Sequence, residues 1–219
     1  MRIQYLGHAC FRLISDGFGH TIITDPYSEQ IVGEQMPELS ADLVTVSHKH
    51  ADHDYVQGVK GDPAVIDCEI VGNYDDVSIS SIKTYHDAEQ GKKRGENLVF
   101  LFKIDGITVA HLGDLGEINK ELVEKLKDVD VLLIPVGGNY TIDSLQAKWY
   151  VDEIQPKIAI PMHYKRGTVK IDVAPPEDFY DLFDFSQVHF LSDTATIFDF
   201  EGYDEYAPTK IYVMEKYED

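Results

Sequence analysis

The segment His48-Lys49-His50-Ala51-Asp52-His53 constrains this chain more than any other feature, because it gathers four metal-binding side chains within six residues. Along an extended segment, residues two apart point the same way, so the first two histidines can bind one cation. After a bend, the aspartate and the last histidine can face a second cation. Residues 42–46 are rich in β-branched side chains and predict a strand that leads into the segment. The sequence therefore predicts a metal centre at the end of a strand.

Two complete metal sites need more ligands than this segment supplies, and candidates follow later predicted strands. His86 comes after residues 77–85, Asp114 after residues 107–111, and His163 after residues 157–161. His111 lies three residues before Asp114 and competes with His86 for one ligand position. Otherwise His111 would support a ligand, face the substrate, or be an ordinary structural histidine. The residues alone leave these alternatives open.

Strand patterns dominate the first half of the chain. Short apolar segments between turn residues predict strands over residues 2–6, 10–14, 20–24, 77–85, 97–104 and 107–111. The dipeptide Asp105-Gly106 predicts a tight hairpin between the last two strands. This half is therefore expected to begin as an antiparallel sheet.

Helices and strands alternate in the second half. Asn119 predicts the start of a helix that runs to residue 127, and Asp143 with Gln146 resembles the capping box of a second helix that ends before Pro156. Strands are predicted over residues 131–136 and 157–161. Together the two halves predict an α/β (α+β) fold, an αββα sandwich. We expect one domain over residues 1–219, with a short, solvated acidic C-terminal extension at residues 201–205 and 214–219.

The formal net charge of −20 disfavours polyanionic partners, so nucleic-acid binding is not expected and a small-molecule substrate is. No stretch approaches the roughly 18 apolar residues of a membrane helix, and the first residues lack the apolar segment of a signal peptide. These patterns predict a cytoplasmic protein without membrane association. They leave homo-oligomer formation open.

The ordered ligand set from Thr24-Asp25-Pro26 to His163 resembles the metallo-β-lactamase superfamily along most of the chain. More narrowly, three motifs are similar to the branch that includes the L-ascorbate-6-phosphate lactonase. These motifs are Gly7-His8-Ala9-Cys10-Phe11, His111-Leu112-Gly113-Asp114 and Pro161-Met162-His163-Tyr164.

The resemblance implies two divalent metal ions, with zinc as the first choice and manganese or iron as alternatives. It assigns His48, His50 and His86 to one cation, Asp52, His53 and His163 to the other, and Asp114 to both. It favours His86 over His111 as the ligand. Asp25 would hydrogen-bond a histidine ligand, or would simply be a turn residue. His8 would lie at the rim of the site or have a structural role.

The implied activity is hydrolysis of a small anionic ester, lactone or phosphate ester by a hydroxide that bridges the metals. Asp52 and His111 are the expected catalytic residues. Candidate substrate-binding residues are Arg94, Asn139, Tyr140 and Tyr164. Arg94 belongs to the basic run Lys92-Lys93-Arg94, which could equally be a solvated loop. The alternatives are a phosphodiesterase or nuclease with the same two-metal site, and a metal-binding or sensory protein without turnover.

Overall fold

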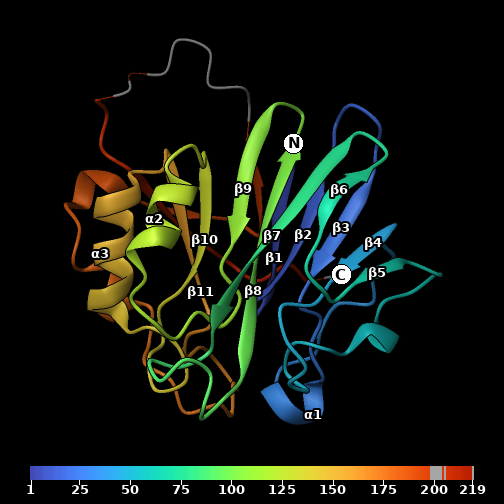
Figure 1. Ribbon diagram of the computed structural model, residues 1–219, viewed down its shortest axis with the longest axis horizontal. Helices are drawn as coiled ribbons and strands as arrows, with labels where there is room; N and C mark the ends of the chain where they lie inside the picture. Colours follow the sequence, from blue (N-terminus) through green and yellow to red (C-terminus); the bar gives the residue numbers. More distant parts are fainter. Residues whose placement is uncertain (198–203, 205, 219) are drawn as a thin grey trace.

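Two sheets packed face to face form the centre of the molecule (Figure 1). The computed structural model describes residues 1–197, 204 and 206–218. Within them, one sheet has six strands in the order β13-β1-β2-β3-β4-β5 and the other has eight in the order β12-β14-β11-β10-β9-β8-β7-β6. With helices outside the sheets, this arrangement confirms the αββα sandwich that the sequence predicts.

The six-stranded sheet begins with the three antiparallel strands that the turn residues predict. Its strands β4 and β5 then add in parallel to β3. The bounds are β1 Arg2–Gly7, β2 Cys10–Ile14, β3 Thr21–Thr24, β4 Leu43–Thr45, β5 Ala64–Ile66 and β13 Thr194–Thr196.

The eight-stranded sheet changes from antiparallel pairing over β6 to β9 to parallel pairing from β9 onward. Asp105 (φ 51°) and Gly106 (φ 81°) form the expected tight turn between β8 and β9. The bounds are β6 Val71–Tyr74, β7 Val77–Tyr85, β8 Glu96–Ile104, β9 Ile107–His111, β10 Val131–Pro135, β11 Ile158–Met162, β12 Val188–Leu191 and β14 Lys210–Met214.

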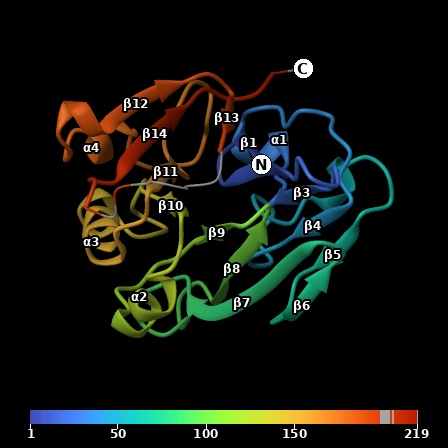
Figure 2. The ribbon, with the colours of Figure 1, turned by 90° about the horizontal axis from the view of Figure 1, so that it is seen from above.

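Helices α2 Lys120–Leu126, α3 Ser144–Ile154 and α4 Glu177–Tyr180 cover the outer face of the eight-stranded sheet (Figure 2). Both predicted caps are present. The side chain of Asn119 accepts the N–H of Leu122 at 3.1 Å, and Asp143 and Gln146 form a capping box. The other sheet is covered by the short helices α1 Glu29–Val32 and η1 Val56–Gly58 with their loops, and η2 Phe185–Gln187 precedes β12.

The hydrophobic core follows from these layers. Phe100, Phe102 and Leu133 are fully buried in the main cluster of apolar side chains, and a smaller cluster around Val44 lies under α1. Each such side chain contributes roughly 1.5–3 kcal/mol when it leaves water. The core therefore fixes both sheets and leaves the strand ends available for polar side chains.

The predicted C-terminal extension is wrong for part of its length. Met214 is the last residue of β14, which lies between β11 and β12, and it is buried. The N–H of Tyr217 then donates to the carbonyl of Tyr5 at 2.7 Å. Acidic neighbours hid the strand, because its burial comes from a parallel partner distant in sequence. Residues 201–203, 205 and 219 lie outside the described residues, and Asp204 is exposed.

Strand direction places the chemistry at one edge of the sandwich. In the first sheet β1, β3 and β4 are parallel to one another, and in the second β7, β9, β10 and β11 are parallel. The carboxyl ends of parallel strands meet at the same edge. The histidines and aspartates that follow these strands are therefore brought together from positions far apart in the sequence.

Candidate metal centre

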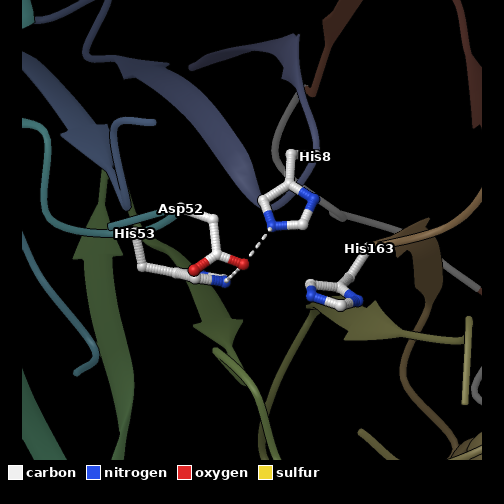
Figure 3. A group of neighbouring side chains, drawn as sticks. All are labelled: His8, Asp52, His53 and His163. Carbon is white, nitrogen blue, oxygen red and sulfur yellow. Dashed lines mark ion pairs between the residues drawn. The ribbon is translucent and has the colours of Figure 1, made fainter. Parts of the chain in front are cut away.

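Two groups of potential metal ligands without a shared residue lie at this edge. One contains His48, His50 and His86, and the other contains His8, Asp52, His53 and His163. A third group, Asp25 with His48 and His53, overlaps both. In each group, ligand atoms from all members lie within 4.8 Å of one another. Figure 3 shows the second group, in which the His8 ring and the Asp52 carboxylate approach each other beside His53 and His163. Six of the seven ligands named from the sequence therefore lie in these groups, and His8 joins them.

Asp114 connects the two groups. Its carboxylate oxygens lie 3.0 Å from Nε2 of His86 and 3.8 Å from Nε2 of His48 in the first group. In the second they lie 3.2 Å from Nε2 of His53 and 3.4 Å from Nε2 of His163. Burial opposes ionisation of Asp114, yet His163 and His53 hold its pKa well below its usual range. A carboxylate in this place can contact cations on both sides.

The donor atoms fit divalent cations. Nε2 of His48, His53 and His163 and Oδ1 of Asp114 are buried and have no hydrogen-bond partner among the described residues. Leaving buried polar atoms unpaired costs free energy, so native proteins rarely tolerate several in one place. Imidazole nitrogens and carboxylate oxygens are the ligands that zinc and related metals accept. Cations bound here would satisfy these atoms together.

Asp25 and Ser47 orient two of the histidines. Oδ2 of Asp25 accepts Nδ1–H of His53 at 2.8 Å and the hydroxyl of Ser47 at 2.6 Å. Because the hydroxyl donates to Asp25, its oxygen is left to accept Nδ1–H of His48 at 2.9 Å. With a cation bound, both rings would thereby direct an unprotonated Nε2 towards the centre. The sequence pointed to Asp25 but missed Ser47, whose position next to His48 was the available signal.

Burial keeps several of the ligands in the form that binds metal. Burial and the neighbouring His53 lower the pKa of His48 to about 3. Burial and His163 lower the pKa of His8 to about 4. Both rings are therefore neutral at physiological pH. Burial also acts against a charge on His53, but Asp114 and Asp25 raise the pKa of this ring in the absence of a cation.

His111 does not fit the predicted catalytic role. Its ring is fully buried, Nε2 lies 2.7 Å from the carbonyl of Ala9, and Nδ1 accepts the N–H of Gly113 at 3.3 Å. Both ring nitrogens therefore bind backbone, and His111 belongs to neither ligand group. The physical reason is that the side chain of His111, the last residue of β9, faces the β1–β2 turn across the sandwich. His86, directly after β7, is a member of the first ligand group, which supports the preference for His86 over His111.

The backbone at the centre is unusual. His8 (φ 53°), Asp25 (φ 41°) and His163 (φ 54°) all have left-handed conformations, which non-glycine residues rarely adopt. Gly113 (φ 54°) is also required for space, since a Cβ there would clash with Oδ1 of Asn97. That oxygen accepts the N–H of Asp114 at 2.9 Å. The left-handed backbones and the close packing at Gly113 thus direct the candidate ligands towards the centre. The role of Asn97 was not apparent from the sequence.

The loop after His86 carries one predicted substrate-binding residue to the centre's edge. The buried carboxylate of Asp87 accepts four backbone N–H groups, those of Glu89, Gly91, Lys93 and Arg94. These bonds hold the pKa of Asp87 down at about 2 despite its burial. The Arg94 guanidinium lies 5.2 Å from the centre of the Tyr140 ring. The structure therefore brings these two candidates together, on a loop fixed by Asp87, whose role the sequence did not reveal.

A cavity of about 600 Å³ lies beside this loop. Its lining includes His48, His50 and Arg94, together with the ion pair in which Lys49 contacts Asp67 at 2.7 Å. A small molecule bound in the cavity would therefore reach the first ligand group and the guanidinium at once.

The other two substrate-binding candidates, Asn139 and Tyr164, do not line this cavity. The Asn139 amide donates to the carbonyl of Asp172 at 2.9 Å and so fixes a neighbouring loop. Tyr164 is 4% exposed and its ring lies 6.0 Å from that of Tyr5, inside the main hydrophobic cluster. The backbone of Asn139 is left-handed (φ 59°), and its amide is occupied by the bond to Asp172. Tyr164 is drawn inward by its apolar ring.

Relatives of the chain give its class. It is 29% identical over 211 residues to a UPF0173 metal-dependent hydrolase from Archaeoglobus fulgidus, covering 82% of this chain and 89% of that one. It is 30% identical over 203 residues to a UPF0173 metal-dependent hydrolase from Carboxydothermus hydrogenoformans, covering 77% and 87%. Together with the fold, these relatives support a metal-dependent hydrolase.

The family follows from two further comparisons. Residues 2–163 match the model of the Beta-lactamase superfamily domain. A crystal structure from Thermotoga maritima, of a candidate zinc-dependent hydrolase of the metallo-β-lactamase superfamily, superimposes with a TM-score of 0.77 at 37% identity, covering 97% of both chains. The chain belongs to the metallo-β-lactamase superfamily. None of the helices in the part of the chain that the structure describes combines the length and the apolar character that a membrane span requires.

Proposed function

We propose that the centre holds two divalent cations, zinc in the first place, and hydrolyses a small anionic ester, lactone or phosphate ester. The observation that carries this proposal is the convergence of two separate ligand groups on one carboxylate, that of Asp114. One group of three histidines can hold a single cation. A second group on the far side of Asp114 has no simpler explanation than a second cation.

Two cations held in this way would lower the pKa of bound water towards roughly 7 and stabilise negative charge that develops on the substrate. The chain's own groups then have distinct tasks. Asp114 holds the two ligand groups at a fixed position relative to each other. Asp52, whose side chain is 20% exposed, can accept a hydrogen bond from the attacking water and orient it towards the substrate. Asp25 and Ser47 keep the ligand rings in one tautomer throughout turnover.

The substrate class rests on Arg94. Its guanidinium is stacked on Tyr140, makes no ion pair with any described residue, and lines the cavity beside His50. A planar guanidinium suits a carboxylate or a phosphate. The net charge of −20 favours one small anion over a long polyanion. A phosphorylated lactone, as the resemblance to the lactonase branch predicts, meets these requirements.

Metal removal tests the proposal directly. We expect a chelator followed by dialysis to abolish hydrolysis of small phosphate esters and lactones, and we expect zinc or manganese to restore it. RNA and cyclic dinucleotides assayed alongside are expected to be poor substrates. Turnover that survives complete metal removal would sink the proposal, and efficient cleavage of RNA would replace it with a nuclease. Metal binding without turnover on any of these compounds would instead indicate a sensory protein.

A further inference from the structure

His8 lies in the turn between β1 and β2, beside the ligands named so far. We propose that His8 is itself a direct ligand of the cation held by Asp52, His53 and His163. This inference rests on the two-cation centre proposed above. It changes the role of His8 from a residue at the rim to a member of the centre.

The backbone around His8 is fixed. Its carbonyl accepts the hydroxyl of Tyr5 at 3.1 Å and the N–H of His163 at 2.9 Å. Gly7 (φ 105°) and His8 (φ 53°) turn the chain sharply at this point. The bond from His163 joins two residues that both have left-handed backbones. Their rings are consequently held close together, with centres 4.3 Å apart.

The two ring nitrogens of His8 are available to a cation. The ring is buried, and neither Nδ1 nor Nε2 has a hydrogen-bond partner among the described residues. Nε2 lies 3.3 Å from Oδ2 of Asp52. Figure 3 shows the His8 ring next to Asp52, with His53 and His163 beside them. A hydrogen bond to Asp52 would occupy a carboxylate oxygen that is needed for the cation. A shared cation satisfies the ring and the carboxylate together.

His111 shows what a structural histidine in this protein looks like. It is equally buried, but both of its ring nitrogens pair with backbone groups. His8 has the same burial without such partners. The contrast argues against a packing role for His8, because packing alone would leave Nδ1 unpaired and Nε2 with only the 3.3 Å contact to Asp52, at a cost in free energy.

The sharpest test replaces His8 by glycine. Glycine suits the left-handed backbone, so His8→Gly is expected to fold at least as well as the wild type when both are metal-free. Gln155→Gly is the matched control, since Gln155 has a similar backbone (φ 55°) at the end of α3, away from the centre. Thermal unfolding of the metal-free proteins checks that the variants remain folded.

The main readouts are cation affinity and the absorption spectrum of the cobalt-loaded protein. Loss of a group that only supports a ligand weakens binding about 10–100-fold. We expect His8→Gly to weaken the second cation beyond this range and to change the cobalt spectrum, while the control does neither. Added imidazole is expected to restore both properties, because it can enter the space that the side chain leaves.

The possible outcomes separate the two proposals. A His8→Gly protein that keeps wild-type affinity and spectrum overturns the assignment of His8 while leaving the two-cation proposal intact. A loss within about 10–100-fold with an unchanged cobalt spectrum also overturns the assignment, because His8 would then be a positioning residue for Asp52. A wild-type protein that binds fewer than two cations overturns the proposed function itself.

Discussion

The two ligand groups differ in how they meet solvent. In the first group, His50 is exposed and lines the same cavity as Arg94. In the second, the three histidines are buried, and Asp52 is the member that is partly exposed. One half of the centre is therefore open towards a substrate and the other is enclosed by the β1–β2 turn.

This difference suggests that the two groups have different functions. The enclosed group, with four candidate ligands besides Asp114, suits a firmly held cation. The open group, with three histidines, leaves room for a substrate oxygen. Both depend on the same carboxylate of Asp25, which contacts His53 directly and His48 through Ser47. The comparison can be tested by changes that act on both groups, on one group, or on the substrate alone.

Asp114 should give the largest effect, because it contacts both groups. We expect Asp114→Ala to lower kcat/KM by more than the 10²–10³-fold typical for loss of one stabilising group, and to reduce binding of both cations. Metal content after dialysis and steady-state rates on a phosphate ester measure the two effects. Loss of one cation alone would show that Asp114 serves a single group.

Asp25 and Ser47 separate the groups. Asp25→Asn should weaken both cations by about 10–100-fold, because it disturbs His53 and, through the hydroxyl, His48. Ser47→Ala should act more strongly on the open group, since His48 loses its partner while His53 keeps its bond to Asp25. Chelator competition resolves the two affinities. If Ser47→Ala weakened both cations equally, as Asp25→Asn is expected to do, the proposed link from Asp25 through Ser47 to His48 would be contradicted.

Arg94 tests the substrate side. Arg94→Met should lower kcat/KM for anionic substrates by about 10–100-fold, as expected when a charged hydrogen bond worth about 1.5–3 kcal/mol is lost. Neutral esters should be almost unaffected, because they never use the guanidinium. Tyr140→Phe, which keeps the ring under Arg94, is the conservative control. A similar loss on neutral and anionic esters would remove Arg94 from substrate binding.

The smallest effect is expected at Asp87, through its loop and its pH dependence. Its pKa is lowered to about 2 in the folded protein, against about 3.9 in an unfolded chain. A depressed pKa means that the carboxylate stabilises the fold above the unfolded value and that this contribution is lost as the pH falls through the folded one.

We therefore expect Asp87→Asn to lower the free energy of unfolding at neutral pH. The difference from the wild type should shrink between about pH 4 and pH 2. Denaturant titrations across this range measure it, and hydrogen exchange should be faster at the amides of Gly91 and Arg94 in the variant at neutral pH. A difference between the two proteins that is independent of pH would show that the carboxylate's charge is not what holds the loop.

Much of the fold could be predicted because its signals are local. The cap of α2 at Asn119 and the turn at Asp105-Gly106 depend on neighbours within a few residues, and both are confirmed. β14 escaped prediction because nothing near it in sequence reveals its parallel partners. Their register, in which Ile158 faces Lys210, is set only in the folded sheet.

In the candidate site, too, features with local sequence signals could be predicted and features set by distant partners could not. Histidine and aspartate at strand ends marked the ligands, since strand ends and residue types are both readable. Whether a buried histidine binds metal or backbone depends on its three-dimensional partners, and for His111 these include the carbonyl of Ala9, far away in sequence. Burial likewise distinguishes two predicted substrate-binding residues, since Arg94 lines the cavity whereas Tyr164 lies in the main hydrophobic cluster.

The position of β14 has a consequence for how the protein matures. This strand pairs with β11, the strand that carries His163 at its end, and the segment after it returns to Tyr5 beside His8. During synthesis the ribosome releases the early strands first. Residues 210–217 contact both β11 and Tyr5, so these two supports of the second ligand group are completed only after every candidate ligand has been synthesised.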